Sequence, residues 1–208
     1  DPSFYFASLA HSTALLNLRR CFDLGRGSIF VSGEIGAGKT TLVRELMAQI
    51  DPIRVSVAEV VSSQLHADEL LELVSSAFGF DGKGLGAPLA RLESFLASLP
   101  SQGRRALLVI DEAQNLEGDA FQLLCDLASL RSEGAALLQV FVLGQPEIRD
   151  RDDARAYLRL IEGTGVSLHL GPLSFAETGA YIEHRLRKVG WNGRPAIERE
   201  VFDQVYRR

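Results

Sequence analysis

Residues Ser28–Thr41 read SIFVSGEIGAGKTT, and this segment is the strongest indication of the fold class. Within it, Gly33–Thr40 matches the phosphate-binding loop pattern G-x-x-x-x-G-K-[ST]. The glycines let the backbone take turns that other residues disfavour, so that successive N–H groups can face a phosphate chain. We expect a helix that starts near Lys39 to direct its positive end at the same anion.

The side chains of the loop have separate predicted roles. Lys39 is expected to reach the β- and γ-phosphate oxygens, and the Thr40 hydroxyl is expected to ligate Mg²⁺. An apolar run before the loop and an amphipathic helix after it favour a nucleotide site over an incidental glycine turn. The residues predicted to bind ATP are Gly33, Glu34, Ile35, Gly36, Ala37, Gly38, Lys39, Thr40 and Thr41.

A second apolar run ends in two acidic residues. Ala106–Ile110 is continuously apolar, as is typical of a strand buried on both faces of a parallel sheet, and Asp111 and Glu112 follow it. Open α/β sheets bind ligands at the carboxyl ends of their strands. We therefore predict that Asp111 orients Mg²⁺ and that Glu112 activates the water that attacks the γ-phosphate. The adjacent glutamate favours hydrolysis over phosphorylation of a small molecule.

The remaining periodicity predicts an α/β fold with a parallel sheet. Gln145, at the tip of one predicted strand, is the candidate contact to the γ-phosphate. The other predicted strands cover 54–61, 137–143 and 166–170, and the predicted helices cover 11–20, 67–80, about 88–99, a segment that follows a capping box at Ser174–Glu177, and 196–206. Leu16 belongs to the predicted helix over 11–20, and Val189 is expected on the apolar face of the helix that follows the capping box.

The aromatic segment Phe4–Phe6 has two interpretations. Core packing is the simpler one. The alternative is that these rings line the pocket for adenine, because they stand just before the first strand.

Composition limits the class of protein. The 208 residues carry a formal charge of −5, so no overall basic field draws the chain onto nucleic acid. Cys21 and Cys125 are predicted to be reduced thiols of a cytosolic protein. No apolar run is long enough to span a bilayer, and no signal peptide is recognisable. Since the chain lacks an initiator Met and stops at Arg208, we expect it to be a piece of a longer protein.

Together the motifs resemble a known family. The blocks are DPSFYFASLAHSTAL, SGEIGAGKTTLVRELM, LLVIDEAQNL, LLQVFVLGQPEIRDR and LGPL…ET…YIEHRL. In this order they resemble the ExeA-type general secretion ATPases of the AAA+ superfamily. Within that group the chain looks most similar to the ATPases associated with exosortase (XrtA), PEP-CTERM and exopolysaccharide-export loci of Gram-negative bacteria. The similarity covers essentially the whole chain.

The resemblance implies a P-loop NTPase (RecA-like, AAA+) core with a five-stranded parallel sheet in the order 5-1-4-3-2, flanked by helices. Residues 1–171 would form this core and residues 172–208 the start of a small helical lid. It assigns Lys39 and Thr40 to the phosphates and Mg²⁺, Asp111 and Glu112 to Mg²⁺ and the attacking water, and Gln145 to sensing of the γ-phosphate.

The resemblance also implies partners and a location. ATP or ADP and Mg²⁺ would bind, the chain would form a homo-oligomer, and a membrane- or cell-wall-associated export partner would use it. The expected location is cytoplasmic, with or without peripheral attachment to the inner membrane.

Two departures from the family pattern concern catalysis. Ile161 and Gly163 stand where the family carries closely spaced arginines, so that Arg155 and Arg159 are the substitutes for an arginine finger. The Pro-Arg step of the lid, which supplies a second sensor, would lie beyond Arg208. We therefore expect slow ATP hydrolysis in isolation. A DNA-associated AAA+ ATPase of the transposition-helper type and a weakly hydrolysing nucleotide-binding scaffold remain alternatives.

Overall fold

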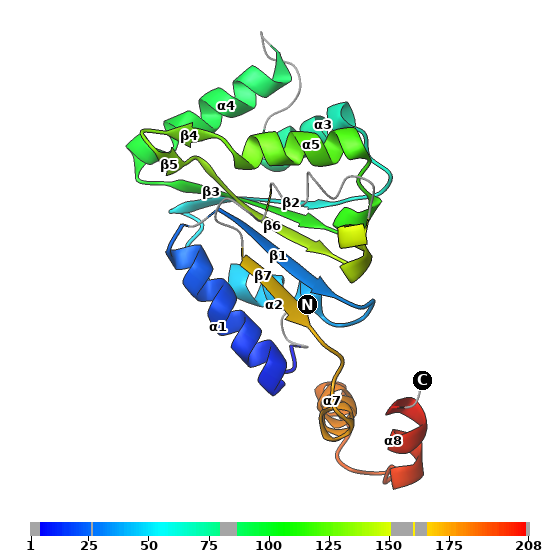
Figure 1. Cartoon of the computed structure of the whole chain (residues 1–208). Coiled ribbons are helices and arrows are strands. Elements are labelled where there is room, and N and C mark those ends of the chain that lie inside the picture. The colour runs from blue at the N-terminus through cyan, green and yellow to red at the C-terminus, as the bar shows by residue number, and fades with distance from the viewer. Residues whose placement is uncertain (1–4, 26, 80–86, 151–159, 161–165, 207–208) are drawn as a thin grey trace.

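The computed structural model describes residues 5–25, 27–79, 87–150, 160 and 166–206. A sheet of five parallel strands forms its centre (Figure 1). Its strands lie in the order β2-β3-β6-β1-β7. If these five strands are numbered 1 to 5 along the chain and the sheet is read from β7 to β2, the order is 5-1-4-3-2, which confirms the expected order. Their bounds are β1 Ser28–Gly33, β2 Val55–Val61, β3 Arg105–Asp111, β6 Leu138–Gly144 and β7 Val166–Leu170.

Helices cover both faces of the sheet. Helices α1 and α2 lie on one face, and α3, α4 and α5 lie on the other (Figure 1). The bounds are α1 Leu9–Asp23, α2 Lys39–Met47, α3 Ala67–Ala77, α4 Pro88–Ser98, α5 Gly118–Ala128, α7 Phe175–Lys188 and α8 Arg199–Tyr206.

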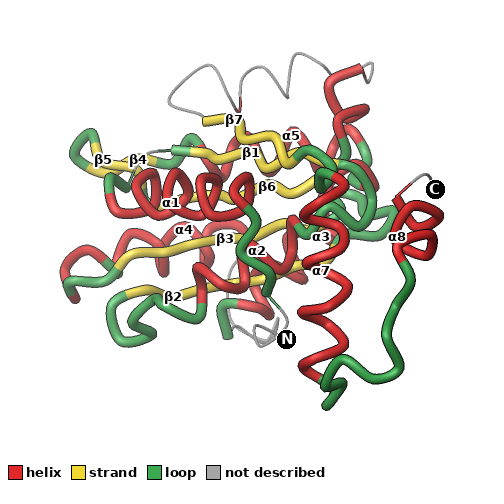
Figure 2. Tube along the Cα trace, turned by 90° about the horizontal axis from the view of Figure 1, so that it is seen from below, coloured by secondary structure: helices red, strands yellow, loops and turns green. Residues whose placement is uncertain are grey.

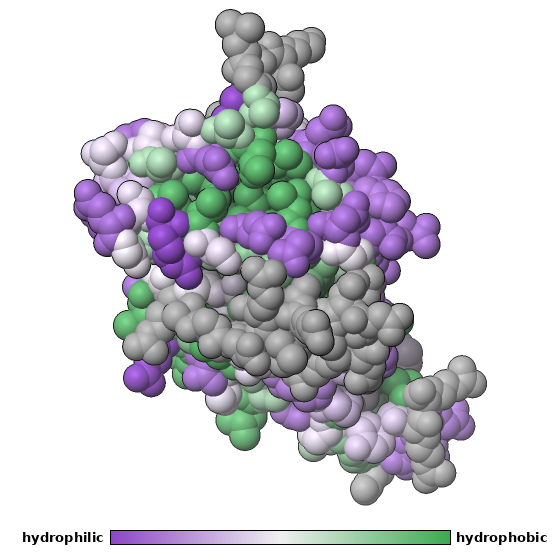
Figure 3. Space-filling view, turned by 45° about the horizontal axis from the view of Figure 1, so that its top comes forward, coloured by the Kyte–Doolittle hydropathy of each residue, from purple (hydrophilic) through white to green (hydrophobic). Residues whose placement is uncertain are grey.

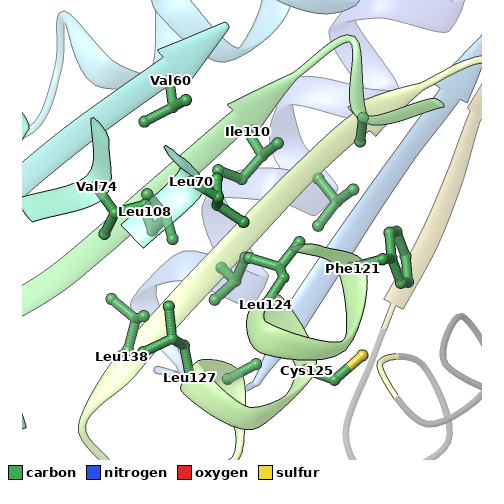
Figure 4. Packing of buried hydrophobic residues seen from close by; sticks show 14 of the residues in the cluster. Val60, Leu70, Val74, Leu108, Ile110, Phe121, Leu124, Cys125, Leu127 and Leu138 are labelled. Carbon is green, nitrogen blue, oxygen red and sulfur yellow. The ribbon is translucent and has the colours of Figure 1, made fainter. Parts of the chain in front are cut away.

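The apolar run Ala106–Ile110 lies within strand β3 and packs on both faces of the sheet. Leu107 and Val109 belong to the buried cluster under α1 and α2, whereas Leu108 and Ile110 belong to the cluster under α3, α4 and α5. Figure 4 shows Leu108 and Ile110 among side chains of α3 and α5, such as Leu124. Because both faces are covered, successive residues of this run pack alternately against the two helical layers, and all five are therefore apolar.

Local contacts move two helix boundaries from their predicted positions. The first helix begins at Leu9, not at His11, because the Ser8 hydroxyl accepts a hydrogen bond from the backbone of His11 and caps an earlier start. Helix α3 ends at Ala77, before the predicted Phe80, and Gly79 follows with φ +90°, as is common just after a helix.

Two apolar side chains of the predicted helical segments are exposed. Leu16 and Val189 are each 72% exposed. Leu16 lies on the outer face of α1, between the buried Ala14 and Leu18, and Val189 follows α7, a helix with no buried residue. The structure also contains α5 and a short hairpin that the sequence patterns did not predict, with β4 at Arg131–Ser132 and β5 at Ala135–Ala136.

The last two helices lie beyond the carboxyl end of β7, away from the two helical layers (Figures 1 and 2). Ser174 and Glu177 form the predicted capping box at the start of α7. Helix α7 contacts α8 through the rings of Phe175 and Tyr206, whose centroids are 5.5 Å apart. These helices occupy residues that the sequence assigned to the lid.

The surface also carries apolar residues. Figure 3 shows apolar side chains gathered between polar ones on the face turned toward the viewer. Cys21 is partly buried and Cys125 is buried, and no disulfide joins these two cysteines. In the described part of the chain, none of the helices combines the length and the hydropathy needed to cross a membrane.

Candidate functional site

The phosphate-binding loop connects β1 to α2 through left-handed backbone. Gly36 has φ +78° and Gly38 has φ +88°, values that side chains disfavour. Gly38 is the residue that precedes α2, and no side chain caps the helix there. The N–H groups at the start of α2 therefore remain available to an anion.

Lys39 is held inside the loop. Its side chain is only 6% exposed, and its ammonium donates hydrogen bonds to the carbonyl oxygens of Gly33 at 2.8 Å and Glu34 at 3.0 Å. A positive charge is thus placed at the uncapped start of α2, where the helix dipole also favours an anion. The loop can bind a phosphate group through backbone N–H groups and one buried cation.

Thr40 and Asp111 meet although 71 residues separate them in sequence. The Thr40 hydroxyl donates a hydrogen bond of 2.5 Å to Asp111 Oδ2, and the Asp111 side chain is 4% exposed. Proteins usually bind Mg²⁺ through one or two carboxylates together with substrate phosphates. A hydroxyl and a buried carboxylate beside a phosphate-binding loop fit that donor set. These two residues could hold Mg²⁺ once a nucleotide supplies phosphate oxygens.

Glu112 sits on unusual backbone. Its φ of +55° and ψ of +39° are left-handed, which costs a non-glycine residue about 1–2 kcal/mol. The buried Ser62 hydroxyl lies 3.0 Å from the Asp111 carbonyl and 2.6 Å from the Glu112 carbonyl and holds this turn from the end of β2. Strain of this kind persists where the surroundings over-determine it, and it is frequent at functional sites.

Gln145 follows β6, which lies between β3 and β1 in the sheet. Its backbone position is therefore between the acidic end of β3 and the phosphate-binding loop. The backbone N–H of Gln145 donates to Gln114 Oε1 at 3.2 Å, and Gln114 Nε2 donates to Glu112 Oε2 at 2.5 Å. The sequence did not single out Gln114.

A pocket of about 460 Å³ adjoins the loop on the side of α7. Binding pockets for small molecules commonly have volumes of about 300–1,000 Å³. The lining includes Glu34, Ile35, Gly36, Ala37, Gly38 and Thr41 of the loop, Tyr5 and Phe6, and Tyr181, Ile182 and Arg185 of α7. Lys39 and Thr40 are not part of this lining, so the loop has an aromatic pocket on one side and the acidic end of β3 on the other.

Tyr5 fits both interpretations of the N-terminal aromatic segment. It packs against the cluster under α1 and α2 and also lines the pocket. Burial, with a smaller contribution from the charge of Glu45, raises the pKa of its hydroxyl, which therefore stays protonated. Phe6 contacts the rings of Tyr181 and His184 at 5.8 and 5.7 Å between centroids. Phe4 lies outside the described residues.

His11 ties α1 to the phosphate-binding loop. Its Nε2 lies 2.8 Å from the carbonyl oxygen of Ala37, and its Nδ1 lies 2.8 Å from the Ser8 hydroxyl. A carbonyl oxygen only accepts, so Nε2 carries a hydrogen. The first turn of α1 also contacts α7, because Glu177 Oε1 accepts a hydrogen bond from the backbone N–H of Leu9 at 3.2 Å. The backbone N–H of Ser174 and, to a smaller extent, its hydroxyl donate hydrogen bonds to the Glu177 carboxylate and hold its pKa below the usual value.

Two glycines of the loop allow a matched test of this contact. A Cβ at Gly38 would lie 2.9 Å from His11 Nε2, whereas a Cβ at Gly36 would meet nothing within 4 Å, although both residues have positive φ. Crowding of this kind costs about 1–3 kcal/mol, and 1.4 kcal/mol is about tenfold in affinity. We expect Gly38→Ala to weaken ATP binding about tenfold more than Gly36→Ala in a titration with a fluorescent ATP analogue. Equal losses would show that the fit against His11 does not matter for binding.

The structure thus brings most of the predicted residues to one edge of the sheet. The loop, Asp111, Glu112 and Gln145 all lie at the carboxyl ends of β1, β3 and β6. Two groups of predicted residues lie outside the described part of the chain. They are the arginine-finger candidates Arg155 and Arg159, and the positions that depart from the family pattern, Ile161 and Gly163.

Sequence reasoning missed three residues of the site. Gln114 could have been noticed because it stands two residues after Glu112 in the acidic motif. His11 was one of four scattered histidines without a metal-binding pattern, and Ser62 carried no signal. Each of these residues contacts either a residue distant in sequence or a residue of an irregular turn. The periodicity of apolar residues does not predict such contacts.

The comparisons with known proteins agree with this geometry. A family model described as "AAA domain" matches residues 23–151, more than half of the chain. General secretion pathway protein A of Aeromonas hydrophila is 29% identical over 193 residues, which are 91% of this chain and 35% of that protein. The chain therefore spans about a third of the length of this relative.

Solved structures share the fold. The ORC2 protein of Aeropyrum pernix, in its ADPNP–ADP complexes, superimposes with a TM-score of 0.65 at 18% identity, over 88% of this chain and 54% of that one. Cdc6p from Pyrobaculum aerophilum superimposes with a TM-score of 0.64 at 15% identity, over 89% and 53%. At these identities the similarity concerns the fold alone.

Proposed function

The chain belongs to the AAA domain family, and from this we propose that it binds ATP with Mg²⁺ and hydrolyses it as an oligomeric switch or motor. The observation that carries the proposal is the hydrogen bond between Thr40 and Asp111. It joins the phosphate-binding loop to the acidic end of β3, so that one Mg²⁺ could contact both residues and a phosphate chain. Glu112 beside this pair would activate water, and Gln145 would contact the γ-phosphate.

We propose that the aromatic pocket receives the base. The loop would then hold the phosphates between this pocket and the acidic edge. Residues 1–171 would act as the nucleotide-binding core and residues 172–208 as part of a helical lid, since Tyr181, Ile182 and Arg185 of α7 complete the pocket.

We further propose that the cellular role lies in an envelope secretion or exopolysaccharide-export system. The support is the similarity to a protein named for the general secretion pathway, together with the motif blocks that resemble secretion ATPases. A membrane- or cell-wall-associated partner and a cytoplasmic location, with or without attachment to the inner membrane, belong to this proposal. The net charge of −5 disfavours nucleic acid as the partner.

The test is Mg²⁺-dependent ATP hydrolysis measured across a wide range of protein concentration, with and without DNA. We expect slow turnover whose specific activity changes little with concentration in the wild type, Arg155→Ala and Arg159→Ala. An arginine from a neighbouring subunit can be worth about 10³–10⁵ in rate. A steep rise with concentration that either substitution removes would therefore identify a finger and contradict the expected slow rate.

The measurement with added DNA distinguishes the proposed function from the alternatives. Stimulation of turnover by DNA would favour an ATPase of the transposition-helper type. A complete lack of hydrolysis with intact ATP binding would favour a nucleotide-binding scaffold.

A further inference from the structure

Gln114 connects two parts of the site that lie on different strands. It belongs to the short 3₁₀ turn Ala113–Asn115 that follows Glu112. Its Nε2 donates to Glu112 Oε2 at 2.5 Å, and its Oε1 accepts from the backbone N–H of Gln145 at 3.2 Å. One side-chain amide therefore spans from the end of β3 to the end of β6.

The chemistry of the partners fixes the orientation of this amide. A carboxylate only accepts hydrogen bonds, and a backbone N–H only donates. The Gln114 side chain satisfies both groups in one orientation, with nitrogen toward Glu112 and oxygen toward Gln145. The bond to Glu112 involves a charged acceptor, so it is stronger than a neutral one.

The backbone of β6 approaches this amide closely. A Cβ at Gly144 would lie 3.3 Å from Gln114 Oε1 and 3.6 Å from Ile148 Cδ1. A side chain at this position would press on the bridge. The lack of one lets the Gly144–Gln145 turn lie against Gln114.

A glutamate that activates water needs a defined direction. Its side chain has several rotatable bonds, and at Glu112 the backbone is itself left-handed. The hydrogen bond from Gln114 engages Oε2, and Oε1, which has no hydrogen-bond partner among the described residues, could accept from water. Without this bond, the carboxylate would sample other rotamers, and fewer of them would meet the attacking water.

We propose that Gln114 is a positioning residue that holds the Glu112 carboxylate toward the attacking water and couples its orientation to the Gly144–Gln145 turn. A shift of that turn when the γ-phosphate binds or leaves would reach Glu112 through this amide. The inference rests on the proposed ATPase function and adds the residue that orients its base.

Steady-state kinetics test the positioning role. Gln114→Ala should lower kcat for Mg·ATP about tenfold or more, as expected for loss of a hydrogen bond to a charged group, while KM changes less than about twofold. The matched control is Gln122→Ala on α5, because Gln122 Nε2 also donates to a carboxylate, Asp126 Oδ1 at 2.9 Å, on the exposed surface. This control should leave kcat unchanged.

A double-mutant cycle distinguishes positioning from a structural effect. If Gln114 acts through Glu112, Gln114→Ala should lower kcat by less than about twofold when Glu112→Gln is already present. A loss of the same size in both backgrounds would overturn the proposal, as would an unchanged kcat in Gln114→Ala alone.

Amide hydrogen exchange examines the bridge without any reaction. Loss of the acceptor in Gln114→Ala should speed exchange of the Gln145 N–H about tenfold, and Gln122→Ala should not. Unchanged exchange would overturn the coupling to the Gly144–Gln145 turn. If the wild type hydrolyses no ATP, the proposed function fails together with the positioning role, whereas faster exchange in Gln114→Ala would still establish the bridge.

Discussion

Lys39→Ala is expected to lower ATP affinity by about 10²-fold or more. Each hydrogen bond to a charged group contributes about 1.5–3 kcal/mol, and a lysine in this loop would contact both the β- and γ-phosphates. The structure places its ammonium within the loop, 2.8 Å from the Gly33 carbonyl. Isothermal titration with ATP in the presence of Mg²⁺ measures the effect.

The control for this prediction is Lys188→Ala. Lys188 is exposed in the last turn of α7, so its loss changes the net charge equally and touches neither the loop nor the pocket. ATP affinity should stay at the wild-type value there. Circular dichroism should show that Lys39→Ala remains folded. Wild-type affinity in folded Lys39→Ala would remove the loop from the binding site.

Glu112→Gln is expected to separate binding from chemistry. Glutamine has a similar shape but cannot accept the proton of the attacking water. Turnover should fall by about 10²–10⁴, the usual contribution of a general base, while Mg·ATP still binds. Single-turnover measurement of phosphate release, together with ATP titration, gives both quantities.

An exposed glutamate on α3 provides the comparison. Glu72→Gln removes the same charge at an exposed position of α3 that is not among the candidate site residues, and it should leave turnover unchanged. If Glu112→Gln turned over ATP at the wild-type rate, another group would have to activate the water. The left-handed backbone at Glu112 would then need a different explanation.

Local patterns predicted the elements well where one physical signal dominated. Strand β7 has the predicted bounds Val166–Leu170, and the capping box at Ser174 starts α7 as expected. The order of the strands came from resemblance to a family, because pairing between distant strands leaves no mark in the periodicity of either one. Leu16 shows the limit of periodicity, since an apolar residue can lie on the outer face of an amphipathic helix without cost to the fold.

The amino-acid sequence alone specifies the local features of the candidate site: a glycine-rich loop before Lys39 and Thr40, and two carboxylates at the end of an apolar strand. These are local features, because φ freedom, helix starts and burial alternation act over a few residues. Which of these groups meet depends on how the strands pair. The pairing of Thr40 with Asp111 and the amide bridge of Gln114 depend on the parallel order of β3, β6 and β1, which brings the carboxyl ends of strands far apart in sequence to one edge.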